Sequence, residues 1–283
     1  MKSNTSYSIF NTLGRGIGQV MFQGNALSGL LMLIGIGISN WSLALWALGG
    51  NIVSTLVAYL CGCNRTDIRH GLYGFNGTLV GIAAGVWMPF SPLTLLLMAL
   101  ASALSTGIAG AFNLQQKLPA LTAPFILATW ILLGICNWGL PQCLLPTQSA
   151  SPAFQQIDAL QASFTGIGQV MFQGSIWSGL CFLADILLHS RIGAAYALLG
   201  TLLSLPLAMG LGVDASLINL GLMGYNGVLC AMALGGRSLH SFALACGSVV
   251  LSVVLQLLGM KCGIPTLTAP FVLSVWIMRR LGS

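Results

Sequence analysis

The residues best suited to chemistry in this sequence are uncharged polar side chains that occur twice, inside otherwise apolar segments. Thr122 lies in Pro-Ala-Leu-Thr-Ala-Pro-Phe, and Thr268 lies in the matching Pro-Thr-Leu-Thr-Ala-Pro-Phe. Gln19 and Gln169 take the same position in two copies of Gly-Ile-Gly-Gln-Val-Met-Phe-Gln-Gly. Hydroxyl and amide groups both donate and accept hydrogen bonds without carrying charge. These pairs therefore favour recognition of a small, flat, neutral solute with several N–H groups.

A third duplicated segment confirms that the chain consists of two related halves. Gly-Leu-Tyr-Gly-Phe-Asn-Gly at residues 71–77 returns as Gly-Leu-Met-Gly-Tyr-Asn-Gly at residues 221–227. Asn76 and Asn226 are 150 residues apart, whereas Thr122 and Thr268 are 146 apart. The second half has therefore lost four residues between these two segments.

The composition places both halves in a membrane. Of the 283 residues, 56% are hydrophobic and only 5% are charged, and the mean hydropathy is +0.91. A soluble protein needs more polar surface than this. The net charge of +6 comes from Lys and Arg residues at the ends of apolar runs. That placement indicates membrane topology and not a nucleic-acid site.

The apolar runs predict an all-α integral membrane protein with ten transmembrane helices in two inverted five-helix repeats. Residues 16–22 and 166–172 are too short to span a bilayer, so we expect each to form a re-entrant half-helix. Proline interrupts the last span of each repeat, which predicts a discontinuous helix. The expected spans are residues 27–38, 43–60, 71–87, 93–111 and 119–138, then 176–188, 194–211, 217–234, 242–258 and 264–278.

The expected domains are a first repeat at 1–138, an extracytoplasmic linker at 139–165 and a second, inverted repeat at 166–283. Five spans per repeat require the repeats to have opposite orientations. With a cytoplasmic N-terminus, nine of the ten Lys and Arg residues fall on the cytoplasmic side, Lys261 being the exception. The sequence thus predicts a multi-pass protein with both termini in the cytoplasm.

Inverted repeats place a transport pathway at their interface, near the membrane midplane. Pro124 and Pro270 lack an N–H, so the carbonyls of Ala120 and Thr266 lose their helical partners and become candidate acceptors. Together with the paired threonines and glutamines they predict a row of hydrogen-bonding groups. Aromatic and aliphatic pairs predict the walls, namely Phe22 with Phe172, Phe75 with Tyr225, and Leu79 with Leu229. The glycines beside these residues also fit a simple close helix crossing, and Asn76 and Asn226 also fit a role in bracing the broken backbone.

Charged groups and catalytic motifs are missing from the duplicated segments, which contain no carboxylate, Lys or His. The acid within an apolar run, Asp185, has Gly35 at the equivalent position, and we expect it to pair locally with His189. The Cys61-Gly62-Cys63 pair has no ligands placed to complete a zinc site. The chain contains no Glu and no recognisable nucleophile or acid–base pair, so we expect neither an enzyme nor a cofactor or metal.

With these segments in view, the sequence resembles the urea transporters of bacteria and animals. The resemblance rests on Gly-Gln-Val-x-Phe followed by Asn-Ala-Leu-Ser-Gly at 25–29, on Gly-Phe-Asn-Gly-Thr-Leu-Val-Gly at 74–81, on Leu-Pro-Ala-Leu-Thr-Ala-Pro-Phe at 118–125, and on their second-half counterparts. It implies a channel-like, passive urea pathway in each subunit of a homotrimer in the cell inner membrane, surrounded by lipid.

The resemblance also implies that urea passes edge-on through a slot while its N–H groups donate to a ladder of oxygens. The ladder would involve Thr122 and Thr268, and Gln19 and Gln169 would border it. The slot would be formed by Val20, Phe22, Phe75, Leu79, Val170, Phe172, Tyr225 and Leu229. Tyr225 replaces the phenylalanine of the first half and adds a hydroxyl. Alternatives are a channel for ammonium, water or small amides, or a proton-coupled carrier that uses Asp185.

Overall fold

The computed structural model describes residues 8–115, 117–146, 154 and 156–282. All regular secondary structure in these ranges is helical. The elements run in chain order as α1 (Ile9–Gln19), α2 (Ala26–Leu60), α3 (Arg65–Arg69), α4 (Gly74–Trp87), α5 (Pro92–Gln115), α6 (Ala123–Gly139), the 3-10 turn η1 (Pro141–Cys143), α7 (Ala159–Gln169), α8 (Ile176–His189), α9 (Arg191–Gly210), α10 (Ala215–Asn219), α11 (Tyr225–Leu234), α12 (Leu239–Lys261) and α13 (Ala269–Leu281).

Four of these helices, α2, α5, α9 and α12, are long and apolar enough to cross a bilayer. Each exposes large hydrophobic side chains on its outer surface, among them Leu45, Leu96, Leu202 and Leu258. Exposed apolar surface of this extent is stable in lipid and not in water. The protein is therefore an all-helical membrane protein, as the composition predicts.

The helix α2 combines two of the expected spans. Asn40 has non-helical backbone angles (φ −156°, ψ 105°), and its side-chain oxygen accepts hydrogen bonds from the N–H groups of Ser42 and Leu43. Asn40 therefore caps a new helical segment. At the equivalent place Ser190 separates α8 from α9 and accepts from the N–H of Gly193. The runs predicted at 27–38 and 43–60 thus correspond to the two segments of α2.

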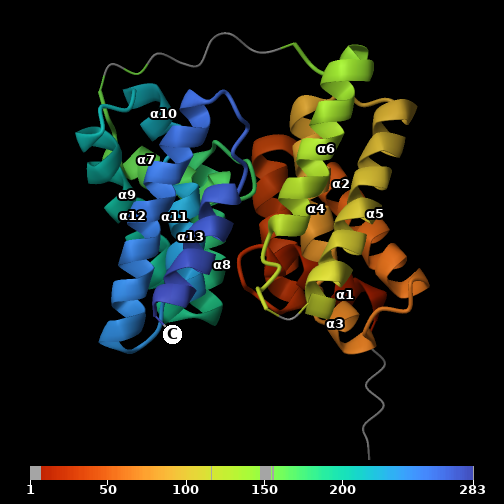
Figure 1. Ribbon diagram of the computed structural model, residues 1–283, viewed down its shortest axis with the longest axis horizontal. Helices are drawn as coiled ribbons and strands as arrows, with labels where there is room; N and C mark the ends of the chain where they lie inside the picture. The colour runs from red at the N-terminus through yellow and green to blue at the C-terminus, as the bar shows by residue number, and fades with distance from the viewer. Residues whose placement is uncertain (1–7, 116, 147–153, 155, 283) are drawn as a thin grey trace, which may run out of the picture.

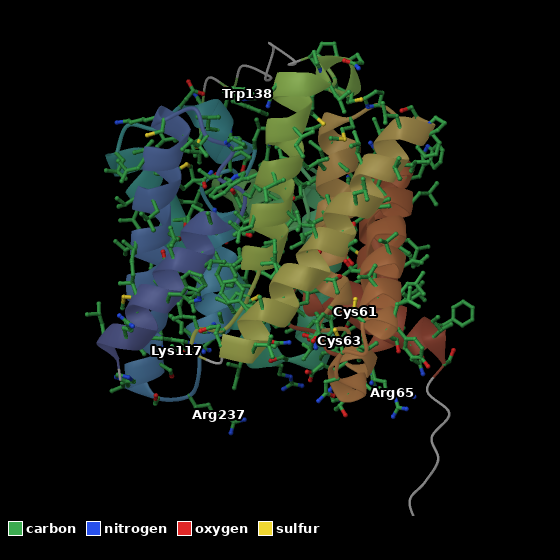
Figure 2. The ribbon with its side chains drawn as sticks, turned by 45° about the vertical axis from the view of Figure 1, so that its right-hand side comes forward. Cys61, Cys63, Arg65, Lys117, Trp138 and Arg237 are labelled. Carbon is green, nitrogen blue, oxygen red and sulfur yellow. The ribbon has the colours of Figure 1, made fainter. Side chains whose placement is uncertain are left out.

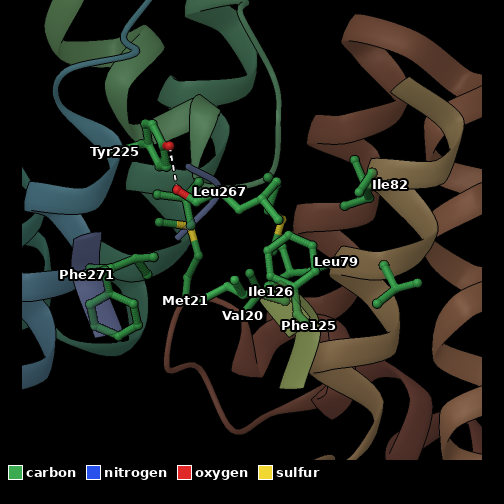
Figure 3. Close-up of a cluster of buried hydrophobic side chains, with 14 of the residues drawn as sticks. Val20, Met21, Leu79, Ile82, Phe125, Ile126, Tyr225, Leu267 and Phe271 are labelled. Atoms are coloured by element: carbon green, nitrogen blue, oxygen red, sulfur yellow. Dashed lines mark hydrogen bonds between the residues drawn. The ribbon is translucent and has the colours of Figure 1, made fainter. Parts of the chain in front are cut away.

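The order of elements in α1–α6 is repeated in α7–α13, with α8 and α9 together matching α2. Figure 1 shows the first group on the right and the second on the left, with α2 and α8 in contact at the junction. The equivalent short helices α3 and α10 lie at opposite ends of the molecule (Figure 1). Buried side chains from both groups meet between them, including Val20, Phe125 and Phe271 (Figure 3).

Several expected boundaries differ from the structure. The span expected at 217–234 is divided between α10 and α11, and the spans expected to begin at 71, 119 and 264 begin as helices only at Gly74, Ala123 and Ala269, after turns. The segment 16–22 is not a separate half-helix, because α1 runs without interruption from Ile9 to Gln19 and Val20–Phe22 forms a turn. The helix α7 begins at Ala159, inside the range expected for the linker. Asp158 explains that start, because its carboxylate accepts from the N–H groups of Leu160 and Gln161.

Candidate functional site

The duplicated segments line two cavities of about 410 and 400 Å³. We call the cavity lined mainly by first-half motifs the first cavity, and the other the second cavity. Of the predicted pathway residues, the first cavity is lined by Gln19, Val20, Phe22, Phe75, Ala120, Thr122 and Leu229. The second is lined by Gln169, Val170, Phe172, Tyr225, Thr266 and Thr268. Leu79 lines neither cavity and is buried in the core.

The two paired threonines meet where the cavities approach each other. The hydroxyl oxygens of Thr122 and Thr268 are 2.7 Å apart, and the side chains are 4% and 2% exposed. Thr122 lines the first cavity and Thr268 lines the second. One hydroxyl donates to the other, and each oxygen has two lone pairs, so the pair keeps acceptor capacity for a solute.

Each threonine is the N-cap of a helix, α6 or α13, yet neither side chain makes a capping hydrogen bond. The capping acceptor comes from another helix. Asn76 Oδ1 accepts from the N–H of Phe125, and Asn226 Oδ1 accepts from the N–H of Phe271, both at 3.1 Å. The bracing role predicted for the two asparagines is confirmed. Because the asparagines cap the helices, the hydroxyls of the threonines face each other instead.

The prediction that proline frees the carbonyls of Ala120 and Thr266 is wrong. Residues 120–123 form a turn at the start of α6, and Ala120 O accepts from the N–H of Ala123 at 3.0 Å. Thr266 O accepts in the same way from Ala269 at 3.0 Å. Proline has no N–H, so each carbonyl lacks the helical donor four residues ahead. The tighter turn supplies instead the N–H of the residue three positions ahead, Ala123 or Ala269.

The carbonyls turned toward other elements belong instead to Leu121 and Leu267, which line the first and second cavities. Both have positive φ angles, +47° and +50°. This conformation is uncommon for a residue with a side chain and is found where surrounding structure enforces it. Asn76 Nδ2 lies 3.5 Å from Leu121 O, and the Tyr225 hydroxyl donates to Leu267 O at 2.6 Å.

The two paired glutamines are held by equivalent contacts. Gln19 Nε2 donates to the carbonyl of His70 at 3.1 Å, and Gln169 Nε2 donates to the carbonyl of Leu220 at 3.0 Å. In each case the amide nitrogen is occupied by backbone, which leaves the side-chain oxygen as an acceptor at the cavity.

Aromatic rings from one half pack on rings from the other. Phe22 meets Phe271 edge to face with centroids 6.4 Å apart, and Phe172 meets Phe125 at 6.2 Å. Phe22 and Phe172 have φ angles of +60° and +61°, and each ends the turn after a duplicated helix. The rings thus form an apolar wall beside each set of oxygens. Trp87 adds a further edge-to-face contact with Phe172 at 5.7 Å.

The sequence analysis did not predict some of the residues that line the cavities. Phe271 lines the first cavity and belongs to a duplicated segment, so the repeat itself contained the signal. Gln256 and Trp87 line the second cavity, but they lie outside the duplicated segments and have no polar or aromatic counterpart in sequence. Only the packing of helices brings them to the cavity.

Asp185 lies away from both cavities, between α8 and α2, and is 1% exposed. Its carboxylate is 3.3 Å from Nδ1 of His189, so the predicted local pairing is confirmed. The same imidazole nitrogen is 3.2 Å from the hydroxyl of Ser28 on α2. Among the described residues no group of three His, Cys, Asp or Glu side chains is placed to hold a metal ion.

Hydrogen-bonding side chains from two related halves line both cavities of this helical membrane protein, and Asp67 lines the first cavity as well. Such an arrangement is typical of a transporter of small solutes. Comparison with known proteins identifies its class further. Residues 10–282 match the family described as Urea transporter, and the chain belongs to this family. It is 32% identical over 287 residues to Urea transporter 1 of Ovis aries, covering 92% of this chain and 73% of that protein. It is 33% identical over 257 residues to Urea transporter 1 of Mus musculus, covering 82% and 66%. The resemblance inferred from the motifs is confirmed, and the family is one of transporters and not of enzymes.

Proposed function

We propose that the protein carries urea passively across the membrane, through the two cavities and past the pair of Thr122 and Thr268. The contact between these two hydroxyls supports the proposal, because it joins a residue that lines the first cavity to a residue that lines the second. Urea is flat and neutral and has four N–H hydrogens. Its edge donates to oxygens while its faces pack on rings and aliphatic side chains.

The oxygens available to urea follow one another along this route. Gln19 and Leu121 line the first cavity, Thr122 and Thr268 lie at the junction, and Gln169 lines the second cavity; we propose that their oxygens accept from urea. A solute that meets a new acceptor before it leaves the previous one avoids the cost of an unpaired N–H group. This ladder supports a channel-like pathway without a large conformational change.

The helix ends at the junction favour a neutral solute over a cation. The N-termini of α6 and α13 begin directly after Thr122 and Thr268, and a helix N-terminus carries a partial positive charge. No His lines either cavity, which argues against the ammonium alternative. Asp185 lines neither cavity, which argues against a proton-coupled carrier that uses Asp185.

We also propose ten spans in inverted repeats of residues 1–138 and 166–283, with both termini cytoplasmic. The opposite positions of α3 and α10 support inversion. Arg65, Lys117 and Arg237 lie at one end of the molecule and Trp138 at the other (Figure 2), which supports the orientation by the positive-inside rule. Location in a cell inner membrane and assembly as a homotrimer follow from the family resemblance.

The proposal is tested by stopped-flow light scattering on proteoliposomes that receive an inward urea gradient. We expect urea to equilibrate much faster than in empty liposomes, at a rate that is unchanged by a pH or sodium gradient. A rate equal to that of empty liposomes with correctly inserted protein would exclude urea as the substrate. A rate that depends on the pH gradient and is abolished by Asp185→Asn would instead support the proton-coupled carrier.

A further inference from the structure

The two cavities are built from related segments but differ in their polar side chains. Phe75 and Ala120 of the first cavity correspond to Tyr225 and Thr266 of the second. The second cavity also contains Gln256, from α12, and this side chain is 3% exposed. The cavities therefore present different hydrogen-bonding groups to the same solute.

A chain of hydrogen bonds determines which end of the Gln256 amide faces which partner. The N–H of Phe271 can only donate, so Asn226 must present Oδ1 to it, at 3.1 Å. Asn226 Nδ2 is therefore a donor, and it lies 3.1 Å from the side-chain oxygen of Gln256. The N–H of Phe271 therefore fixes the orientation of the Asn226 amide, and the Asn226 amide in turn fixes the orientation of the Gln256 amide.

This orientation leaves the Gln256 nitrogen as a donor without a partner among the described residues. Its oxygen accepts from Asn226, and the Tyr225 hydroxyl lies 3.3 Å from the same oxygen. None of the described residues accepts from Nε2, although the side chain lines the second cavity. Because the side chain is almost buried and lines the second cavity, this N–H₂ group is available to a solute in that cavity.

The first half has no side chain at the position equivalent to Gln256. The offset of 146 residues between Thr122 and Thr268 places Gly110 opposite Gln256. A Cβ added at Gly110 would meet no atom within 4 Å, so the first half has open space at this position. The Gln256 amide is therefore not part of the duplicated pattern.

We propose that Gln256 is a specificity-determining residue whose Nε2 donates to the carbonyl oxygen of urea in the second cavity. The inference rests on the proposed function and adds a second point of recognition to it. The oxygen ladder favours solutes with N–H groups that donate, whereas the N–H₂ group of Gln256 favours solutes with a strong hydrogen-bond acceptor. Thiourea keeps the planar shape and the four N–H hydrogens of urea, but its sulfur is a weaker acceptor.

The test compares urea and thiourea fluxes in proteoliposomes that contain the wild type or Gln256→Met, which keeps side-chain length and removes the amide. We expect the urea-to-thiourea flux ratio of the variant to fall about fivefold, as for the loss of one net hydrogen bond. Ser252→Ala is the matched control, since Ser252 lies on the same helix and its hydroxyl bonds to Val249 O. We expect this control to keep the wild-type ratio. Gln256→Leu repeats the test if the methionine variant does not fold.

The outcomes separate this inference from the proposed function. Wild-type urea flux together with an unchanged ratio in folded Gln256 variants would overturn the role of Gln256 alone. A wild type that passes thiourea as fast as urea would overturn it as well, without any variant. Wild-type urea flux equal to that of empty liposomes would overturn the proposed function and this inference together.

Discussion

At the residue scale, the central feature is a pair of N-cap threonines whose hydroxyls do not cap their own helices, because an asparagine from another helix accepts the capping hydrogen bond. Threonine at an N-cap normally bonds to the backbone of its own helix. Here Asn76 and Asn226 provide those bonds, so Thr122 and Thr268 can face each other across the two halves. The contact between the two threonine hydroxyls therefore depends on Asn76 and Asn226, which lie on other helices.

We predict that Thr122→Val combined with Thr268→Val slows urea flux about tenfold or more, because valine keeps the shape and removes both acceptors. An unpaired N–H of the solute costs about 1–3 kcal/mol at each lost acceptor. Stopped-flow measurement on proteoliposomes tests this. Thr129→Val is the control, since Thr129 lies on α6, is buried, and its hydroxyl has no partner among the described residues. Unchanged flux in a folded double variant would contradict the proposed junction.

We predict that Asn76→Leu lowers the free energy of unfolding by about 1–3 kcal/mol, because the buried N–H of Phe125 loses its acceptor. Thermal melting in detergent measures the effect. Asn113→Leu is the comparison: Asn113 lines the same cavity but bonds a tyrosine hydroxyl, which can rotate toward another partner. Equal melting temperatures for the two variants would contradict the capping role.

At the element scale, a tight turn after each duplicated helix brings a phenylalanine to one of the two cavities. The turn after α1 is closed by the N–H of Gln23, which donates to Gly18 O at 2.9 Å, and the turn after α7 is closed in the same way. A Cβ at Gly18 would lie 2.3 Å from Gln23 O, and one at Gly168 would lie 2.4 Å from Gln173 O. Glycine is therefore required in both copies for close packing of the chain against itself.

Gly18→Ala is expected to destabilise the protein and to reduce urea flux, because the turn must open to accept the methyl group and Phe22 moves with it. Gly107→Ala is the matched control, since a Cβ there meets no atom within 4 Å. In the middle of α5, alanine should stabilise by roughly 0.5–1 kcal/mol. Thermal melting and flux of both variants are the measurements, and equal behaviour would argue against a steric role for Gly18.

At the scale of the whole molecule, the two halves are tied by reciprocal contacts. Trp130 Nε1 donates to Pro265 O at 2.7 Å, and Trp276 Nε1 donates to Pro119 O at 3.0 Å. Each tryptophan lies on the last helix of one half and holds the turn before the last helix of the other. A relative movement of the halves would break both bonds, which favours a fixed pathway over alternating access.

The proposed orientation predicts opposite accessibility for two exposed cysteines, Cys61 and Cys262. In variants that keep one of them, a membrane-impermeant maleimide should label Cys262 in intact cells. It should label Cys61 only after permeabilisation, because Cys61 lies beside Arg65 at the basic end (Figure 2). Trp138→Cys in a cysteine-free background is the control for the outer side, since Trp138 is 93% exposed. Labelling of Cys61 from outside would reverse the orientation.

The sequence by itself determined the helical membrane class and the family. Each of these depends on composition or on segments that are contiguous in the chain, where hydropathy and repeats are directly readable. All the pathway residues that the sequence predicted, except Leu79, line one of the two cavities, because the polar and aromatic positions are duplicated. The sequence did not predict hydrogen bonds that depend on the local backbone conformation. The carbonyls of Ala120 and Thr266, for example, accept from the N–H groups three residues ahead.

Only the tertiary structure decided which distant side chains meet. The contact between Thr122 and Thr268 joins residues 146 apart, and the cap on Phe125 comes from Asn76 on another helix. Gln256 became a candidate only because Asn226 fixes the orientation of its amide beside the second cavity. Hydrogen-bond direction depends on three-dimensional neighbours, and residue spacing along one chain does not contain that information.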